Sequence, residues 1–318
     1  MIDTISQNPK IGVNSLSDVG YPINNKLVGY DHKLKINYIY DINTKNLSFI
    51  QTAKDLSNLG VNNNKFFLKL YDPKLIGVDP FSPSLTTEQI QRIIIEVVRN
   101  PWYYLREIAR IPEQGSAQGP GSGTPFQLHR GNLAAIYCFL NNINLYLVIP
   151  RQCGKTQSML AILNWTYMFG TTSSEFSFVN KSQKDSNDNL ARFKAQKELL
   201  PLYLQQKYVM YDGELKPNRG KDNVQTIENA INGNRVVTKP SARTIESAEN
   251  VGRGNTSPIQ LFDEVEFTSF IGVIMKASGP ALTLNKRLIL VIVYVNLSNC
   301  WKLLLYKTIS SQASYILR

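Results

Sequence analysis

Cysteine and histidine are scarce in this chain of 318 residues. The three cysteines are Cys138, Cys153 and Cys300, and no two of them form a C-x-x-C pair. The two histidines, His32 and His129, do not stand at the spacing of metal ligands. We therefore expect neither a zinc site nor a framework of structural disulfides.

Long apolar runs are also missing. The run LILVIVYV, Leu288 to Val295, is too short for a transmembrane helix, which needs about 20 predominantly apolar residues. The N-terminal start, MIDTISQNPK, has no positive region followed by an apolar core, so it does not read as a secretory signal. We expect a protein without a membrane span, located in the cytoplasm.

Acidic residues are outnumbered by basic ones. The chain has 24 aspartates and glutamates against 35 lysines and arginines, which gives a formal net charge of +11 and a pI of about 9.4. This balance favours a polyanionic partner such as nucleic acid. There is no basic low-complexity tail, so a polyanion would contact folded surface patches.

A glycine-containing basic loop follows an apolar run in LYLVIPRQCGKT, Leu145 to Thr156. In the pattern G-x-x-x-x-G-K-[ST], backbone N–H groups and the lysine surround phosphates, and the hydroxyl binds Mg²⁺ at the start of a helix. Lys155 and Thr156 would take these two roles, although Ile149 stands where the first glycine of the pattern belongs. The alternative is a solvated turn with an ordinary surface lysine.

The segments around this loop alternate between strand and helix patterns. Apolar strands are predicted at 143–149, 175–180 and 259–264, and helices at 156–169 and 182–204. Such alternation is typical of a mainly parallel sheet flanked by helices. The predicted fold class is therefore α/β, with a small β-containing region at the N-terminal end.

Two carboxylates end the apolar strand IQLFDE. Ligands of open α/β sheets bind at the carboxyl ends of the strands. Asp263 is thus placed to hold Mg²⁺, and Glu264 to orient or deprotonate an attacking water. The alternative is an acidic loop that caps the next helix.

Composition and pattern divide the chain into three predicted parts. Residues 1–85 form the small N-terminal region, with asparagine-rich turns such as VNNNK. Residues 86–283 form the main domain, which begins with a helix whose capping box pairs Thr86 with Gln89. Residues 284–318 form an atypical basic and apolar segment.

Three motifs in this order carry a resemblance to a known family. They are PFQLHRGNLAAI (Pro125 to Ile136), PRQCGKTQS (Pro150 to Ser158) and SAENVGRGNTSPIQLFDEVEFT (Ser247 to Thr268). Together they resemble the large terminase subunit of tailed bacteriophages, the ATP-driven motor that packages DNA into the prohead. The resemblance covers roughly residues 100–280 and implies that 86–283 is a P-loop ATPase motor domain.

The resemblance implies roles for single residues. Glu264 would be the catalytic carboxylate and Arg151 an arginine finger supplied by the same chain, since a guanidinium fork suits developing phosphoryl charge. Mg²⁺ would be held by Thr156 and Asp263. Adenine would be read by Gln127. The implied nucleotide-binding residues are Gln127, Arg151, Gln152, Cys153, Gly154, Lys155 and Thr156.

The implied activity is Mg²⁺-dependent ATP hydrolysis coupled to translocation of double-stranded DNA into the prohead, with ATP and Mg²⁺ as the bound groups. Implied partners are the portal protein, the small terminase subunit and further copies of this chain, in the host cytoplasm. Two alternatives stay open. One is a helicase-like DNA-dependent ATPase, and the other is a truncated, non-catalytic fragment that binds DNA or partner subunits.

The chain departs from the family pattern after Pro280. Family members continue with a polar coupling motif and a nuclease domain with acidic metal ligands, whereas Leu284 to Arg318 contains no acidic residue. Nuclease activity is therefore not expected in this chain. The run LILVIVYV could form the next core strand, with Asn296 and Ser298 in place of the coupling residues. A truncated product, an interrupted gene or a shifted reading frame would explain the change.

Overall fold

The computed structural model describes residues 21–23, 26–113, 119–149, 154–212, 214–218, 220–240, 242, 244–253, 257–267, 269–274, 276–277, 288–294 and 315–317. Contacts divide the chain into two compact units. The first unit comprises Met1–Arg130 with Glu198–Gln205, and the second comprises Gly131–Lys197 with Gln206–Arg318. The domain boundaries at 85 and 283 stay predictions.

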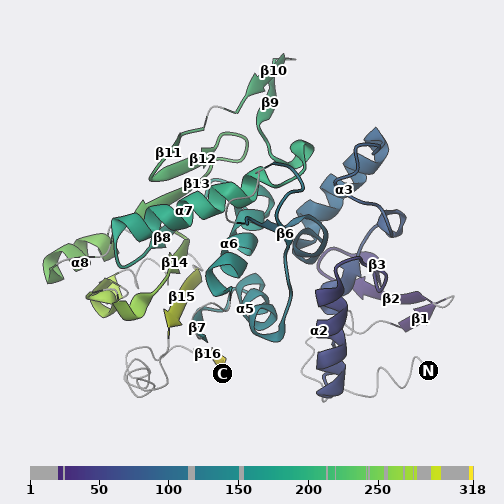
Figure 1. Cartoon of the computed structure of the whole chain (residues 1–318), viewed down its shortest axis with the longest axis horizontal. Coiled ribbons are helices and arrows are strands. Elements are labelled where there is room, and N and C mark those ends of the chain that lie inside the picture. Colours follow the sequence, from purple (N-terminus) through teal and green to yellow (C-terminus); the bar gives the residue numbers. More distant parts are fainter. Residues whose placement is uncertain are drawn as a thin grey trace. The chain divides into compact units, whose positions relative to one another are not determined.

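The first unit contains a small antiparallel sheet with the strand order β1-β2-β3-β4 (Figure 1). The strands are β1 (Tyr21–Ile23), β2 (Lys26–Asp31), β3 (Ile36–Tyr40) and β4 (Lys69–Leu70). The turn between β2 and β3 is held by Asp31, whose Oδ1 accepts hydrogen bonds from the backbone of Lys33 and Leu34. The prediction of a small N-terminal β-containing region is confirmed.

Short helical segments pack beside this sheet. They are α2 (Leu47–Asn58), η2 (Phe66–Leu68), η3 (Pro73–Leu75), α3 (Thr87–Arg99), α4 (Pro101–Tyr103), the π-helical turn η4 (Tyr104–Ile108) and η6 (Leu202–Leu204). A short hairpin, β5 (Arg110–Ile111) with β6 (Thr124–Pro125), completes the described part of the unit. Its core includes an aromatic cluster in which Phe49 packs edge-on against Phe67 and Phe126, with ring centroids 6.1 and 6.5 Å away.

Helix α3 begins as its sequence predicts. Thr86 Oγ1 accepts a hydrogen bond from Gln89 N (3.2 Å), and Gln89 Oε1 accepts one from Thr86 N (2.9 Å), which is the expected capping box. Asn100 ends the helix and caps the next one, because its Oδ1 accepts a hydrogen bond from Tyr103 N (3.1 Å). Pro101 fits the first position of that next helix because it has no backbone N–H that would need an acceptor.

A buried carboxylate ties α3 to the loop after β4. Glu96 is 1% exposed, and its two oxygens accept hydrogen bonds from the backbone N–H groups of Tyr71 and Asp72 and from the Asn100 amide. Burial raises the pKa of Glu96, and these hydrogen bonds lower it in part.

We expect Glu96→Ala to destabilise the first unit by about 3 kcal/mol, because one buried and two partly buried donors lose their acceptor. Urea unfolding followed by tryptophan fluorescence measures the loss. Glu88 lies on the same helix with an exposed side chain paired to Arg92, so Glu88→Ala is the matched control and should change stability far less. Equal losses in the two variants would contradict the role of the buried carboxylate.

The second unit is built on a mixed sheet that has eight strands among the described residues, in the order β11-β12-β13-β8-β14-β15-β7-β16. All neighbours from β13 to β16 pair in parallel, whereas β11, β12 and β13 pair antiparallel. The strands are β7 (Leu145–Ile149), β8 (Glu175–Val179), β11 (Asp222–Asn223), β12 (Thr226–Asn229), β13 (Asn234–Lys239), β14 (Ile259–Phe262), β15 (Leu288–Tyr294) and β16 (Tyr315–Leu317). The predicted α/β class is confirmed.

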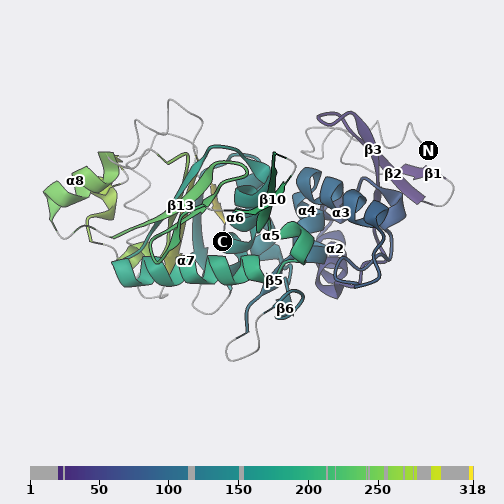
Figure 2. The same ribbon diagram turned by 90° about the horizontal axis from the view of Figure 1, so that it is seen from above.

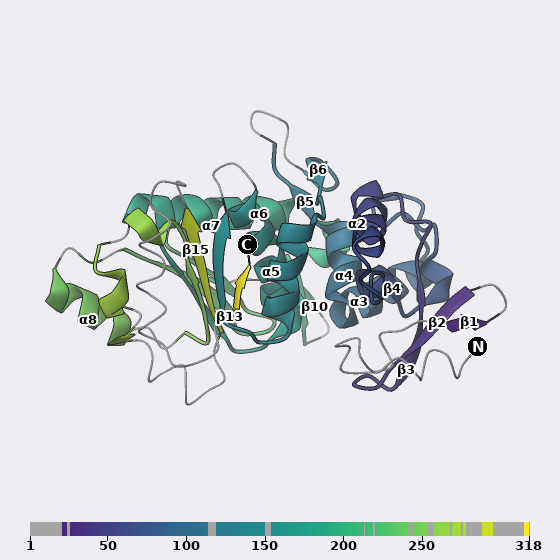
Figure 3. The ribbon, with the colours of Figure 1, turned by 90° about the horizontal axis from the view of Figure 1, so that it is seen from below.

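Helices cover both faces of this sheet. They are α5 (Arg130–Leu140), α6 (Lys155–Trp165) with the π-helical turn η5 (Thr166–Gly170), α7 (Gln183–Glu198), α8 (Ile245–Arg253) and η7 (Val265–Phe267). A hairpin of β9 (Tyr208–Tyr211) and β10 (Glu214–Pro217) extends from the unit. Figure 2 shows α7 running along the sheet, and Figure 3 shows α5 and α6 in the view from below.

Alternation along β8 explains how the two faces are filled. Phe178 packs against Phe193 of α7, with ring centroids 5.7 Å apart. The next residue, Val179, points to the opposite face and joins a buried cluster with Phe262 of β14 and Ala248 of α8. Because β8 and β14 are covered on both sides, nearly all of their residues are buried, as is usual for parallel strands.

The apolar run at 288–295 is a sheet strand, as the sequence suggested. Most of it forms β15, which pairs with β14 and β7. Asn296 and Ser298 lie outside the described residues. In the part of the chain that the structure describes, no helix combines the length and the apolar character needed to cross a bilayer.

Candidate functional site

The carboxyl ends of β7, β8 and β14 carry the candidate site, all within the second unit. Asp263 follows β14, Lys181 follows β8, and Gly154 stands before α6 on the connection from β7. The loop residues Arg151, Gln152 and Cys153 lie outside the described residues. The structure therefore describes Gly154, Lys155 and Thr156 from the predicted phosphate loop, and the nucleotide-binding roles of all six residues stay predictions.

Helix α6 begins directly after Gly154. Gly154 has a left-handed backbone, with φ of +66°, and a Cβ at this position would meet no atom within 4 Å. The backbone conformation, rather than crowding, therefore explains the glycine. Its carbonyl accepts the first helical hydrogen bond from Ser158 N at 2.9 Å. The first N–H groups of α6 are left without helical acceptors and give this end a partial positive charge, which suits an anion.

Thr156 and Asp263 meet at this end of α6, although 107 positions separate them in sequence. Thr156 Oγ1 donates a hydrogen bond to Asp263 Oδ2 at 3.0 Å. The backbone N–H of Asp263 donates to the Val179 carbonyl at 3.0 Å, and this bond ties the end of β14 to β8. The two residues assigned to one magnesium ion from separate motifs are thus side-chain neighbours.

Asp263 is buried and polar contacts surround it. Asp263 is only 4% exposed. Asn189 Nδ2 donates a hydrogen bond to Asp263 Oδ2, the oxygen that also accepts from Thr156, at 3.0 Å. Burial raises the pKa of Asp263, and the hydrogen bonds from Asn189 and Thr156 lower it in part. These hydrogen bonds offset only part of the cost of burying the charged carboxylate, so a nearby cation would stabilise the ionised form.

The oxygen donors fit magnesium. Mg²⁺ prefers hard oxygen ligands and is usually held by one or two protein groups together with phosphates and water. A hydroxyl and a carboxylate are present here, and the described residues contain no cluster of three or more His, Cys, Asp or Glu side chains that could hold a metal. The remaining ligands would have to come from a phosphate group and water.

Glu264 follows Asp263 in a strained conformation. Its φ is +52°, which is uncommon for a residue with a side chain, and such outliers cluster at functional sites. Its backbone N–H donates a hydrogen bond to Asp263 Oδ1 at 3.0 Å. Its carboxylate Oε2 pairs with Lys181 Nζ at 2.8 Å. The Lys181 side chain is 39% exposed and the Glu264 side chain 33% exposed, so the pair is partly solvated.

Two residues of this cluster were missed by the sequence analysis. Asn189 lies on the buried side of α7 with Ser186, Leu190 and Phe193, a helical spacing that could have shown it to face inward. Its Oδ1 accepts a hydrogen bond from Arg192 Nη1 at 3.2 Å. Lys181 stands just after β8, and the same strand-end rule that singled out Asp263 would have found it.

Gln127, the residue expected to read adenine, belongs to the first unit. Its Nε2 donates a hydrogen bond to the carbonyl of Pro125 at 3.0 Å, and the residue is exposed. Its role toward a nucleotide stays a prediction.

No protein-family model matches the chain. No curated protein matches it either. Among solved structures, the chain is similar to the large terminase ATPase domain of Thermus phage P74-26, at 16% sequence identity and a TM-score of 0.37. The match covers 53% of this chain and 65% of that one, so this chain spans less than two thirds of its length. A mutant of the same domain matches over the same shares at 14% identity and a TM-score of 0.36. The likeness is distant, and no residue role rests on it.

Proposed function

We propose that the second unit is a P-loop ATPase that hydrolyses ATP with Mg²⁺, and that the chain is the motor part of a phage terminase large subunit. The contact between Thr156 and Asp263 is the observation that best supports the proposal. The hydroxyl of the phosphate-loop motif and the carboxylate of the strand-end motif come within 3.0 Å at the N-terminal end of α6. A surface turn and an unrelated acidic cap have no reason to meet there.

Each described residue has a definite task in this proposal. Lys155 and the first N–H groups of α6 bind the β- and γ-phosphates. Thr156 and Asp263 hold Mg²⁺, which when bound neutralises part of the phosphate charge. Asn189 is a positioning residue, because its hydrogen bond fixes the carboxylate of Asp263.

Glu264 orients or deprotonates the attacking water. Its ion pair with Lys181 is partly solvated, and exposed pairs of this kind contribute about 0.2–1 kcal/mol. The Glu264 carboxylate can therefore leave the Lys181 ammonium and bind a water molecule with little loss of free energy. Arg151 offsets the charge that develops on the transferred phosphoryl group, and Gln127 reads adenine.

Double-stranded DNA is the proposed polyanionic partner, and the net charge of +11 supports it. The portal protein, the small terminase subunit and further copies of this chain are proposed partners in packaging, in the host cytoplasm.

We expect the purified chain to hydrolyse ATP only with Mg²⁺, and to do so faster when double-stranded DNA is present. Phosphate release is measured with and without DNA, with EDTA as the control for metal dependence. The apparent DNA affinity should fall steeply with added salt, because lysine and arginine contacts release counterions. Turnover without any response to DNA would contradict the motor, and absence of both nucleotide binding and turnover would favour a non-catalytic binding fragment.

We expect Asn189→Ala to raise the Mg²⁺ concentration needed for half-maximal ATP turnover by about 10-fold, because groups that orient a metal ligand typically contribute 10–100-fold. A magnesium titration at saturating ATP measures this. Asn187→Ala is the matched control: this residue lies on the same helix and bonds Gln183 and Thr238 instead of Asp263. A lower maximal rate with an unchanged magnesium requirement would argue against the positioning role.

A further inference from the structure

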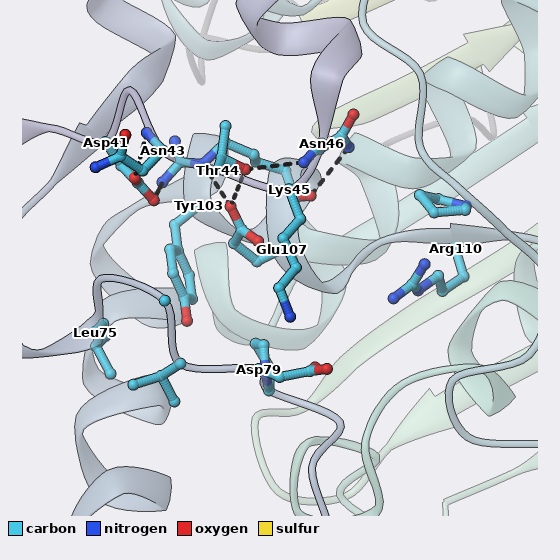
Figure 4. Close-up of a pocket in the computed structure, with 15 residues that line it drawn as sticks. Asp41, Asn43, Thr44, Lys45, Asn46, Leu75, Asp79, Tyr103, Glu107 and Arg110 are labelled. Atoms are coloured by element: carbon cyan, nitrogen blue, oxygen red, sulfur yellow. Dashed lines mark hydrogen bonds and ion pairs between the residues drawn. The ribbon is translucent and has the colours of Figure 1, made fainter.

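The first unit contains a cavity of about 170 Å³ that no sequence motif predicted (Figure 4). Its lining residues belong to three segments, 41–46, 75–80 and 103–110, together with Pro125. The π-helical turn η4 supplies Arg106 and Glu107 to this wall, and π-helical turns are frequent at functional sites.

One wall of the cavity is held by buried ionic contacts. Arg106, which is 2% exposed, donates hydrogen bonds from Nε to Glu107 Oε1 (2.8 Å) and from Nη1 to the Phe67 carbonyl (3.0 Å). Thr44 Oγ1 donates to the same Glu107 oxygen at 2.7 Å, and Asp41 Oδ2 lies 3.7 Å from Arg106 Nη2. The carboxylates of this wall are therefore engaged by donors of the protein itself.

Several donors of the residues that line the cavity make no hydrogen bond, although one of them, Arg106 Nη2, is in the ion pair with Asp41. Tyr103 is 1% exposed, and its hydroxyl has no hydrogen-bond partner. Arg106 Nη2 and Arg110 Nε also make no hydrogen bond. The Arg110 guanidinium lies over the Phe81 ring, 4.7 Å from its centroid. Buried donors without acceptors are costly, so this surplus points to a ligand that accepts hydrogen bonds.

Positive charge is directed to the same space. In Figure 4 the Lys45 side chain extends toward Asp79, with Tyr103 on one side and Arg110, whose guanidinium is turned toward the same space, on the other. Lys45 is an exposed residue, and its ammonium makes no hydrogen bond or ion pair within the described part of the chain. Asp79 is the opposing charge at the rim, and one of its oxygens already accepts a hydrogen bond from Phe81 N at 2.9 Å.

We propose that this cavity binds a small oxyanion, either phosphate or a carboxylate, with Lys45 and Arg110 supplying charge and Tyr103 donating a hydrogen bond. The cavity is small, since typical small-molecule sites measure about 300–1,000 Å³, and we therefore propose a ligand of the size of phosphate or a carboxylate. The proposed site is distinct from the phosphate loop of the proposed ATPase.

The test measures inorganic phosphate and acetate binding by calorimetry, in the Lys155→Ala background so that the proposed phosphate loop does not contribute. Comparing the two probes tells which oxyanion the site prefers. We expect Lys45→Ala and Arg110→Ala each to weaken binding at least 10-fold. Lys54→Ala and Arg99→Ala, which replace exposed cations of the same unit that do not line the cavity, should leave it unchanged. Potassium chloride at equal ionic strength is the control titration. If it gives the same heats as phosphate and acetate, the proposal is overturned.

Two further variants separate the ligand role from a structural one. Tyr103→Phe should weaken binding about 10-fold while the melting temperature without ligand is unchanged or higher, since the hydroxyl has no protein partner to lose. Asp79→Asn should tighten binding, because it removes a like charge beside the anion. Weaker binding in Asp79→Asn would mean that the ligand is a cation, and unchanged affinity in Tyr103→Phe would remove the hydroxyl from the site; either result overturns the proposal.

Discussion

Replacing Lys155 by alanine is expected to lower ATP turnover by at least about 10²-fold and to weaken ATP binding strongly, while the protein stays folded. The lysine stands at the first position of α6, where its ammonium adds a full charge to the partial charge of the helix end. Removing one preorganised group that contacts transferring phosphate typically costs about 10²–10³-fold in rate. Nucleotide titration by calorimetry and phosphate release measure the two effects.

The matched control for this variant is Lys184→Ala. Lys184 lies on α7 with an exposed side chain, so its loss changes the net charge equally without touching the site. Circular dichroism of both variants checks that they fold. Unchanged ATP affinity in folded Lys155→Ala protein would remove the phosphate-loop assignment, whatever the DNA response is.

Replacing Glu264 by glutamine is expected to keep Mg·ATP bound and to lower the turnover by about 10²–10⁴-fold, the usual contribution of a general base. The amide has nearly the shape of the carboxylate but cannot accept a proton from water. In contrast, Asp263→Asn should weaken magnesium-dependent binding, because an ionised oxygen next to the Thr156 hydroxyl is lost. Binding and turnover are measured separately, because Glu264→Gln should lose turnover and Asp263→Asn should lose magnesium-dependent binding.

Two controls isolate the catalytic role of Glu264. Lys181→Met removes the ion pair with Glu264 but leaves the carboxylate, so its turnover should stay within a few-fold of the parent chain. Glu246→Gln removes a negative charge from the exposed side of α8 and should have no effect. If the Lys181 variant loses turnover as fully as Glu264→Gln, the ion pair rather than the base carries the effect. If Glu264→Gln hydrolyses ATP normally, the carboxylate is only structural.

Local patterns predicted the elements well because they depend on neighbours along the chain. The strand patterns at 143–149 and 175–180 correspond to β7 and β8, within two residues at their ends. The helix predicted at 182–204 ends earlier, at Glu198, because Pro201 and a short 3-10 turn interrupt it. The helix predicted at 156–169 is α6 up to Trp165 and then continues as the π-helical turn η5, which its periodicity did not indicate.

By itself, the sequence determined the α/β class, the helix start at Thr86 and the strand-loop-helix around Lys155, since periodicity and capping are properties of short segments. Only the tertiary structure decided which side chains meet. The strand order places β8 between β13 and β14, and this order brings Lys181 to Glu264 and Asn189 to Asp263. The cavity beside Tyr103 likewise depends on three separate segments folding together, and no local pattern encodes such a meeting.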